Sequence, residues 1–205
     1  NGAIATTNVS AVNTLGVLQP GVSSVATSTY TLVNNGTLTS TRNNATTSPG
    51  ATLYLMQAND VINNGSIAYI DPFTGAGTFS AVFTSGGVTN SGSINSSGYG
   101  VRASRVTNSG TIRASNYAVL VDSGAVINSG TITSTGAAAI GDLSNYGTGY
   151  TLTNLAGGVI TGLGAAIQTI GGTISNAGTI NGNVNLNYSD SVSYTHLRAH
   201  ETLRY

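Results

Sequence analysis

Val106-Thr-Asn-Ser-Gly-Thr-Ile112 is a segment that recurs, with small changes, along most of the chain. Its pattern is apolar-x-Asn-x-Gly-x-apolar, and one copy is lengthened by two residues. Seven copies are present, at 32–38, 61–67, 88–94, 106–112, 126–132, 152–160 and 174–180. A repeat of about 20 residues whose length varies by insertion is typical of a solenoid, in which each repeat forms one coil and the insertions form loops.

The repeat has the periodicity of a β-strand. Val106, Asn108, Gly110 and Ile112 share one parity, which is the period of two expected for a strand with one buried face. Thr, Val and Ile, which favour strands, dominate these segments, and no window shows the three-and-four spacing of a helix. The motif is therefore predicted to be a strand whose Val, Asn and Ile point inward.

A second column of residues lies six positions after the motif glycine in the regular part of the chain. Its members are of the types that enter left-handed backbone conformations at low cost, so the column predicts a turn; they are Gly98, Asn116, Gly136 and Gly164. Small residues follow and lead into another strand. One coil is thus predicted to be strand, turn, strand, turn. The sequence predicts an all-β protein, a right-handed parallel β-helix of about seven to eight coils.

The motif asparagine recurs in one frame in all seven copies. Identical polar side chains stacked about 4.8 Å apart can hydrogen-bond along the stack as a ladder. The alternative is that asparagine serves only as a common turn former. The repetition favours a structural ladder, and its predicted members are Asn34, Asn63, Asn90, Asn108, Asn128, Asn154 and Asn176.

The pattern N-x-G-x-I, followed later in the coil by G-x-x-A-I, resembles the passenger domains of Gram-negative autotransporters, the pertactin-like and adhesin-type β-helices. The resemblance covers most of residues 32–188 and is strongest over 88–180. It implies a secreted passenger displayed at the outer membrane, exported by a signal peptide and anchored by a C-terminal transmembrane barrel. Both of those parts are expected outside these 205 residues, so membrane attachment is expected only through that barrel.

The resemblance also implies the function of a stalk or adhesive segment at the cell surface, without catalysis. The expected partners are a host surface, a neighbouring cell or further copies of the chain. Charged residues make up 6% of the chain against about 25% in ordinary domains, so solubility is expected to rest on Thr, Ser, Asn and Gly. A net charge of zero and the absence of lysine predict no nucleic-acid binding. The absence of cysteine excludes disulfides and thiolate metal sites.

The first part of the chain is less regular. Residues 2–4 match the end of a further, incomplete copy, and 5–31 are predicted to form one loose coil. Phe73, Phe79 and Phe83 lie close together in a long insertion. They indicate either a hairpin that folds back and buries them or an exposed contact patch, and burial is favoured because large apolar residues usually close a core.

Residues 192–205 show no trace of the repeat and resemble a translated sequencing-adaptor artefact. The β-helix is therefore assigned to residues 1–191, and the remainder is predicted to be a non-native tail that does not continue the solenoid. The natural protein is expected to extend past residue 190. The alternative is a metal site formed by His196, His200 and Glu201, whose histidines have a helical ligand spacing; the abrupt change in composition argues against it.

One pair of carboxylates raises the possibility of catalysis. Asp122 and Asp142 each lie twelve residues after a motif glycine and are predicted to stack on neighbouring coils. Such a pair would bind a cation or act as in polysaccharide-degrading β-helix enzymes, which is the alternative function. The favoured interpretation is that each residue caps a turn. No catalytic residue, metal ligand or cofactor is predicted.

Overall fold

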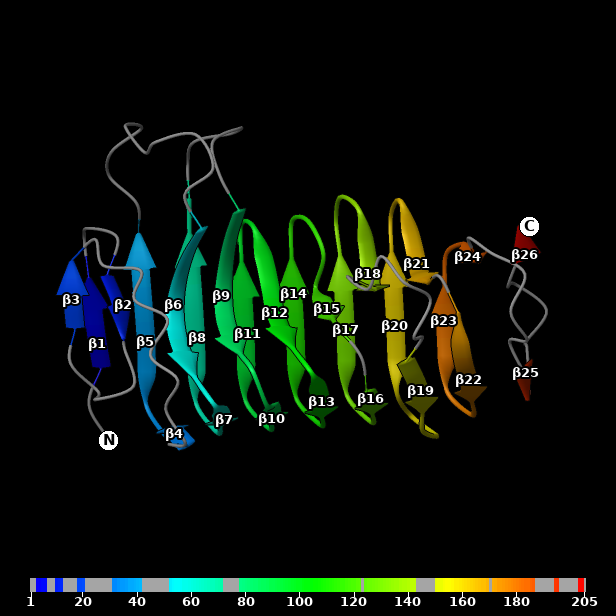
Figure 1. Ribbon diagram of the computed structural model, residues 1–205, viewed down its shortest axis with the longest axis horizontal. Helices are drawn as coiled ribbons and strands as arrows, with labels where there is room; N and C mark the ends of the chain where they lie inside the picture. Colours follow the sequence, from blue (N-terminus) through cyan, green and yellow to red (C-terminus); the bar gives the residue numbers. More distant parts are fainter. Residues whose placement is uncertain are drawn as a thin grey trace.

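The computed structural model describes residues 3–6, 10–12, 18–20, 31–41, 52–71, 78–122, 124–142, 150–169, 171–186, 194–195 and 203–204. Within these ranges the regular elements are all strands (Figure 1). A helix of the length and hydropathy needed to cross a membrane is therefore not found among them.

Each coil consists of three strands. In the coil that begins at residue 87, β10 (Gly87–Asn90) is followed by β11 (Ser93–Ser96) and β12 (Tyr99–Ala103), and each belongs to a different sheet. The predicted order of strand, turn, strand, turn is therefore wrong. The motif is two strands joined at the Asn-Ser-Gly corner, and the inward parity continues across this corner because Asn90 and Ile94 are both buried.

The strands stack into three sheets, numbered here by their order within a coil. The first sheet contains β4 (Thr31–Asn34), β7 (Asp60–Asn63), β10, β13 (Arg105–Asn108), β16 (Gly124–Asn128), β19 (Tyr150–Asn154), β22 (Gly172–Asn176) and β25 (Tyr194–Thr195). The second contains β1 (Ala3–Thr6), β5 (Thr37–Thr41), β8 (Ser66–Ile70), β11, β14 (Thr111–Ala114), β17 (Thr131–Ser134), β20 (Val159–Gly162) and β23 (Thr179–Asn181). The third contains β2 (Ser10–Val12), β3 (Leu18–Pro20), β6 (Thr52–Ala58), β9 (Thr78–Thr84), β12, β15 (Val119–Val121), β18 (Ala138–Asp142), β21 (Ala165–Thr169), β24 (Val184–Leu186) and β26 (Leu203–Arg204).

Every strand of the regular coils pairs in parallel with its equivalents one coil earlier and one coil later. The motif copies are in register, since Val106 is aligned with Val88 and Val126, and Ile112 with Ile94 and Ile132. Seven coils, from β4 to β24, have all three strands described. The predicted parallel β-helix is therefore confirmed.

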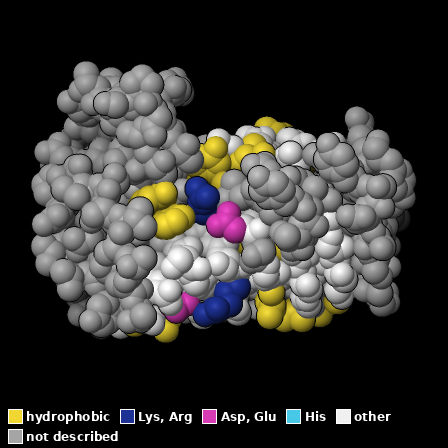
Figure 2. Space-filling model, in the orientation of Figure 1, with side chains coloured by type: hydrophobic (Ala, Val, Ile, Leu, Met, Phe, Trp, Pro, Cys, Tyr) yellow, Lys and Arg dark blue, Asp and Glu magenta, His cyan; other side chains and the backbone are white. Residues whose placement is uncertain are grey.

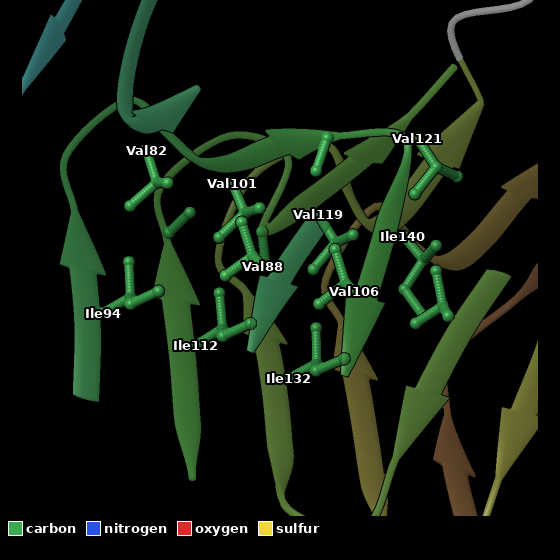
Figure 3. Packing of buried hydrophobic residues seen from close by; sticks show 14 of the residues in the cluster. Val82, Val88, Ile94, Val101, Val106, Ile112, Val119, Val121, Ile132 and Ile140 are labelled. Carbon is green, nitrogen blue, oxygen red and sulfur yellow. The ribbon is translucent and has the colours of Figure 1, made fainter. Parts of the chain in front are cut away.

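The core is a set of apolar rows that run along the axis between the sheets. In Figure 3, Ile94, Ile112 and Ile132 form one row, and Val101 and Val119 belong to another. All five side chains are fully buried. This confirms that the motif Ile points inward, and burial of each such side chain contributes about 1.5–3 kcal/mol.

The motif glycine is required by the close approach of successive coils. A Cβ atom on Gly110 would lie 2.0 Å from the carbonyl oxygen of Gly92, and one on Gly130 would lie 2.1 Å from that of Gly110. Both distances are far below van der Waals contact. The glycines therefore stack directly on one another, and no other residue fits at this corner.

The column of Gly98, Asn116, Gly136 and Gly164 does lie in the corners between the second and third sheets. Its explanation is different from the predicted one, because the three glycines have no left-handed φ, unlike Gly124 at +122°. A Cβ atom on Gly136 would lie 2.1 Å from the carbonyl oxygen of Ser115 on the preceding coil. Lack of space, rather than backbone conformation, selects glycine there.

Over its described residues 78–84, the phenylalanine-containing insertion is not a hairpin folded back on the solenoid. Strand β9, which holds Phe79 and Phe83, pairs in parallel with β6 and β12 as a regular member of the third sheet. Phe79 is buried, as favoured, but Phe83 is partly exposed on the outside. Phe73 lies outside the described residues.

Both ends of the described solenoid carry additional pairing. At the first end, Ile4 is aligned with Leu38, which fits the predicted incomplete copy. At the other end, β25 and β26 pair in parallel with β22 and β24, so the prediction that the tail does not continue the solenoid is wrong for these four residues. Backbone hydrogen bonds do not depend on side chains, and an open strand edge accepts any extended segment. The non-native origin of residues 192–205 stays a prediction, and His196, His200 and Glu201 lie outside the described residues.

Candidate functional site

The motif asparagines form a continuous ladder at the corner between the first and second sheets. The Nδ2 of each asparagine donates to the Oδ1 of the asparagine on the following coil. The six bonds join Asn34 to Asn63 (2.7 Å), Asn63 to Asn90 (2.7 Å), Asn90 to Asn108 (2.8 Å), Asn108 to Asn128 (2.9 Å), Asn128 to Asn154 (2.8 Å) and Asn154 to Asn176 (2.8 Å). The predicted ladder is therefore present in the structure.

The side-chain amides of the ladder also form hydrogen bonds with the backbone around their corners. The Nδ2 of Asn108 lies 3.2 Å from the carbonyl oxygen of Gly110 and 3.2 Å from that of Thr131 on the next coil. Asn108 is 1% exposed, and its neighbours on the ladder are equally buried. A soluble ligand cannot reach these amides, so the ladder is part of the scaffold and the candidate site must lie on the outer faces.

The structure does not align Asp122 with Asp142. Asp142 is the register partner of Val121, one residue away from the predicted alignment. Successive side chains of a strand point to opposite faces, so this offset removes the predicted stacking of the two carboxylates. Asp122 instead lies 3.7 Å from Arg102 on the preceding coil, as an exposed ion pair.

A second ion pair crosses three coils of the first sheet. The Nη2 of Arg105 in β13 donates to Oδ1 of Asp60 in β7 at 2.8 Å, and the same carboxylate oxygen accepts the backbone N–H of Gly87 at 2.7 Å. A Cβ atom on Gly87 would lie 2.6 Å from Nε of Arg105, so the glycine makes room for the arginine to pass. A groove of about 250 Å³ surrounds the pair and is lined also by Thr31, Ile62, Thr89 and Thr107.

The Arg105–Asp60 pair is expected to add little to stability. We expect Arg105→Gln to lower the free energy of unfolding by no more than about 1 kcal/mol, because the Arg105 side chain is 65% exposed. Asp60→Ala is expected to cost more, about 1–3 kcal/mol, because it leaves the buried N–H of Gly87 without its acceptor. Urea unfolding at low and high salt measures both effects; the ion-pair contribution that both variants lose should shrink with salt, whereas the loss of the Gly87 acceptor in Asp60→Ala should remain. A larger loss for Arg105→Gln than for Asp60→Ala would contradict this assignment.

The third sheet carries a group of aromatic side chains that the sequence analysis missed in part. The rings of Tyr54 and Phe83 are stacked with centroids 4.4 Å apart, and the guanidinium of Arg102 lies 5.5 Å from the centre of the Phe83 ring. On the following coils, Tyr99 in β12 and Tyr117 in the corner before β15 have nearly parallel rings with centroids 5.8 Å apart. All four aromatic residues are partly exposed.

Tyr117 reaches along the axis across two coils. Its hydroxyl donates to Oε1 of Gln168 at 3.0 Å, and its ring passes over Gly141, where a Cβ atom would lie 2.6 Å from the ring. Burial raises the pKa of the Tyr117 hydroxyl above its usual value, and the neighbouring Tyr99 raises it further. Tyr99 and Tyr117 each follow their ladder asparagine by nine residues, which is the sequence signal that could have predicted their stacking.

We define the aromatic face as Tyr54, Phe83, Tyr99, Tyr117, Arg102, Asp122 and Gln168. It brings together residues from five coils, including Asp122, but not Asp142. Among the described residues no group of three or more metal-binding side chains is found. No protein-family model, curated protein or solved structure matches the chain.

Proposed function

We propose that the chain is a structural and adhesive segment of a secreted autotransporter passenger, displayed at the surface of a Gram-negative cell. The observation that supports this most is the unbroken asparagine ladder through seven coils. The seven stacked coils form a rod about 30 Å long, given the 4.8 Å spacing of parallel strands. A rod of this kind places an outer face at a distance from an anchor.

The architecture also suits export of an unfolded chain. The strands of each coil pair only with those of the neighbouring coils, so folding can begin at one coil and proceed along the axis as the chain emerges. The absence of cysteine leaves no thiols to form wrong disulfides in an oxidising compartment. These properties support the proposal, together with the resemblance of the motif to passenger β-helices.

The alternative of a polysaccharide-degrading enzyme depended on two stacked carboxylates. Asp142 is aligned with Val121, and Asp122 is paired with Arg102. Neither arrangement provides the two facing carboxylates that glycoside hydrolysis generally uses. We therefore favour an adhesive function without catalysis.

Surface display tests the proposal. The 205-residue chain is placed between a signal peptide and an autotransporter translocator in a Gram-negative host, and antibody labelling of intact cells measures display. We expect a protease-resistant, displayed chain that increases attachment to cell layers or clumping over the translocator alone. The Asn108→Ala variant serves as a matched control with a weakened scaffold.

Two results would contradict the proposal. One is a folded, displayed chain that leaves attachment and clumping at the level of the translocator alone. The other is release of reducing sugar from polysaccharides by the purified chain, because this would favour the enzyme.

A further inference from the structure

The three faces of the solenoid differ in chemistry. Among the side chains that the structure describes, the partly exposed aromatic residues lie in the third sheet or in the corner that leads into it; Tyr54, Phe83 and Tyr99 are in β6, β9 and β12, and Tyr117 precedes β15. The outer positions of the second sheet are mostly hydroxyl-bearing, as in the aligned column Thr37, Ser66, Ser93, Thr111 and Thr131. Among the described residues, the partly exposed aromatic side chains are therefore gathered on one side of the solenoid.

The aromatic face also has polar groups that are able to form hydrogen bonds with a ligand. Figure 2 shows hydrophobic side chains beside basic and acidic ones on the described part of this face. The Arg102 and Asp122 side chains are 33% and 47% exposed, and their 3.7 Å separation is longer than a direct hydrogen bond. A guanidinium has five N–H donors and a carboxylate has several acceptor positions, so both groups retain capacity towards an external ligand.

This combination selects a chemical class of ligand. Rings and planar polar side chains side by side match a molecule that has apolar C–H surfaces and many hydroxyl groups, which is a carbohydrate. Asp122 balances the charge of Arg102, so the face offers no excess positive charge to a polyanion such as a nucleic acid. An aliphatic ligand would leave the exposed ionic groups without partners.

The arrangement of the aromatic face along the axis indicates the length of the ligand. Its residues extend from β6, through β9, β12 and the coil of β15, to β21. With about 4.8 Å per coil, this distance is about 25 Å. It accommodates several linked sugar units rather than one.

We propose that the aromatic face binds an uncharged polysaccharide chain that lies along the axis of the solenoid. This inference rests on the adhesive part of the proposed function and gives it a ligand class. The exposed edges of the stacked Phe83 and Tyr117 rings provide apolar surface, while Arg102 donates to sugar hydroxyls and Asp122 accepts from them.

Binding of the purified chain to immobilised polysaccharides tests the proposal. The probes are xyloglucan, glucomannan, arabinoxylan and dextran as uncharged polymers, with polygalacturonate and heparin as anionic ones. We expect measurable affinity for at least one uncharged polymer. Arg102→Gln should weaken it about tenfold or more, because hydrogen bonds of charged groups are worth at least one factor of ten in affinity.

A matched variant separates binding from stability and net charge. Arg113→Gln removes the same charge from an exposed position on β14 of the second sheet, and we expect unchanged affinity. Phe83→Leu keeps an apolar side chain but removes the ring, and it should weaken binding as Arg102→Gln does. Circular dichroism checks that all three variants keep the β-sheet signal of the parent.

Three results would overturn the proposal: retention of no uncharged polymer, retention of the anionic polymers alone, or equal loss for Arg102→Gln and Arg113→Gln. In each case, attachment and clumping by the displayed chain would still test the proposed function separately. A displayed chain that promotes clumping but binds none of the uncharged polymers would disprove only the polysaccharide inference.

Discussion

Replacing Asn108 by alanine is expected to lower the free energy of unfolding by about 3–5 kcal/mol. The change leaves Asn90 without its acceptor and Asn128 without its donor, and an unsatisfied buried polar group costs about 1–3 kcal/mol. The carbonyl oxygens of Gly110 and Thr131 lose the same amide. Urea unfolding followed by circular dichroism measures the loss. Because Asn108 lies in a middle coil, the single transition is expected to broaden or split in two.

Two further variants identify the cause. Asn95→Ala removes the same side chain from an exposed position on β11, and we expect a change within about 0.5 kcal/mol. Asn108→Asp keeps the size but replaces the donor by an acceptor that faces Oδ1 of Asn128, so it should be destabilising without creating a cavity. Equal stability of the Asn108→Asp variant and the parent at pH 7 would show that the direction of the ladder hydrogen bonds is unimportant.

Gly110→Ala is expected to cost about 3 kcal/mol or more, at the upper end of the usual cost of overpacking. The new methyl group would lie 2.0 Å from the carbonyl oxygen of Gly92, and the obstacle is backbone rather than a flexible side chain. The two coils must separate, which weakens the strand pairing on both sides of the corner. The midpoint of thermal unfolding and the transition in urea report this loss.

The appropriate comparison is Gly157→Ala in the lengthened copy of the motif. No atom lies within 4 Å of the Cβ position there, but the backbone has φ of +85°. The substitution should therefore lower the free energy of unfolding by only about 1–2 kcal/mol, which is the cost of placing alanine in a left-handed conformation. If Gly157→Ala were more damaging than Gly110→Ala, the explanation by close coil contact would be wrong.

The offset of Asp142 shows how a pattern can predict the fold and miss a site. Val119 follows Gly110 by nine residues, whereas its partner Ile140 follows Gly130 by ten. Between the aligned positions, five residues separate Ser134 from Ile140, whereas four separate Ala114 from Val119. Equal distances along the sequence predicted that the two carboxylates are aligned. The extra residue shifts the pairing of β15 with β18 by one position, so that Asp142 is aligned with Val121.

The sequence alone determined the stacked, parallel and in-register coils, the inward rows of Val and Ile, and the asparagine ladder. The physical reason is repetition, because only in-register stacking allows the buried amide of Asn108 to pair with the same group above and below. The number of sheets was decided by the tertiary structure, since the parity of inward residues continues through the Asn-Ser-Gly corner and hides the bend. The aromatic face was likewise decided there, because Tyr117 and Gln168 are 51 residues apart and meet only when the intervening coil carries a glycine, Gly141, beneath the ring. The strand pairing of the tail also depended on three dimensions, because an open sheet edge offers hydrogen bonds that no side-chain pattern records.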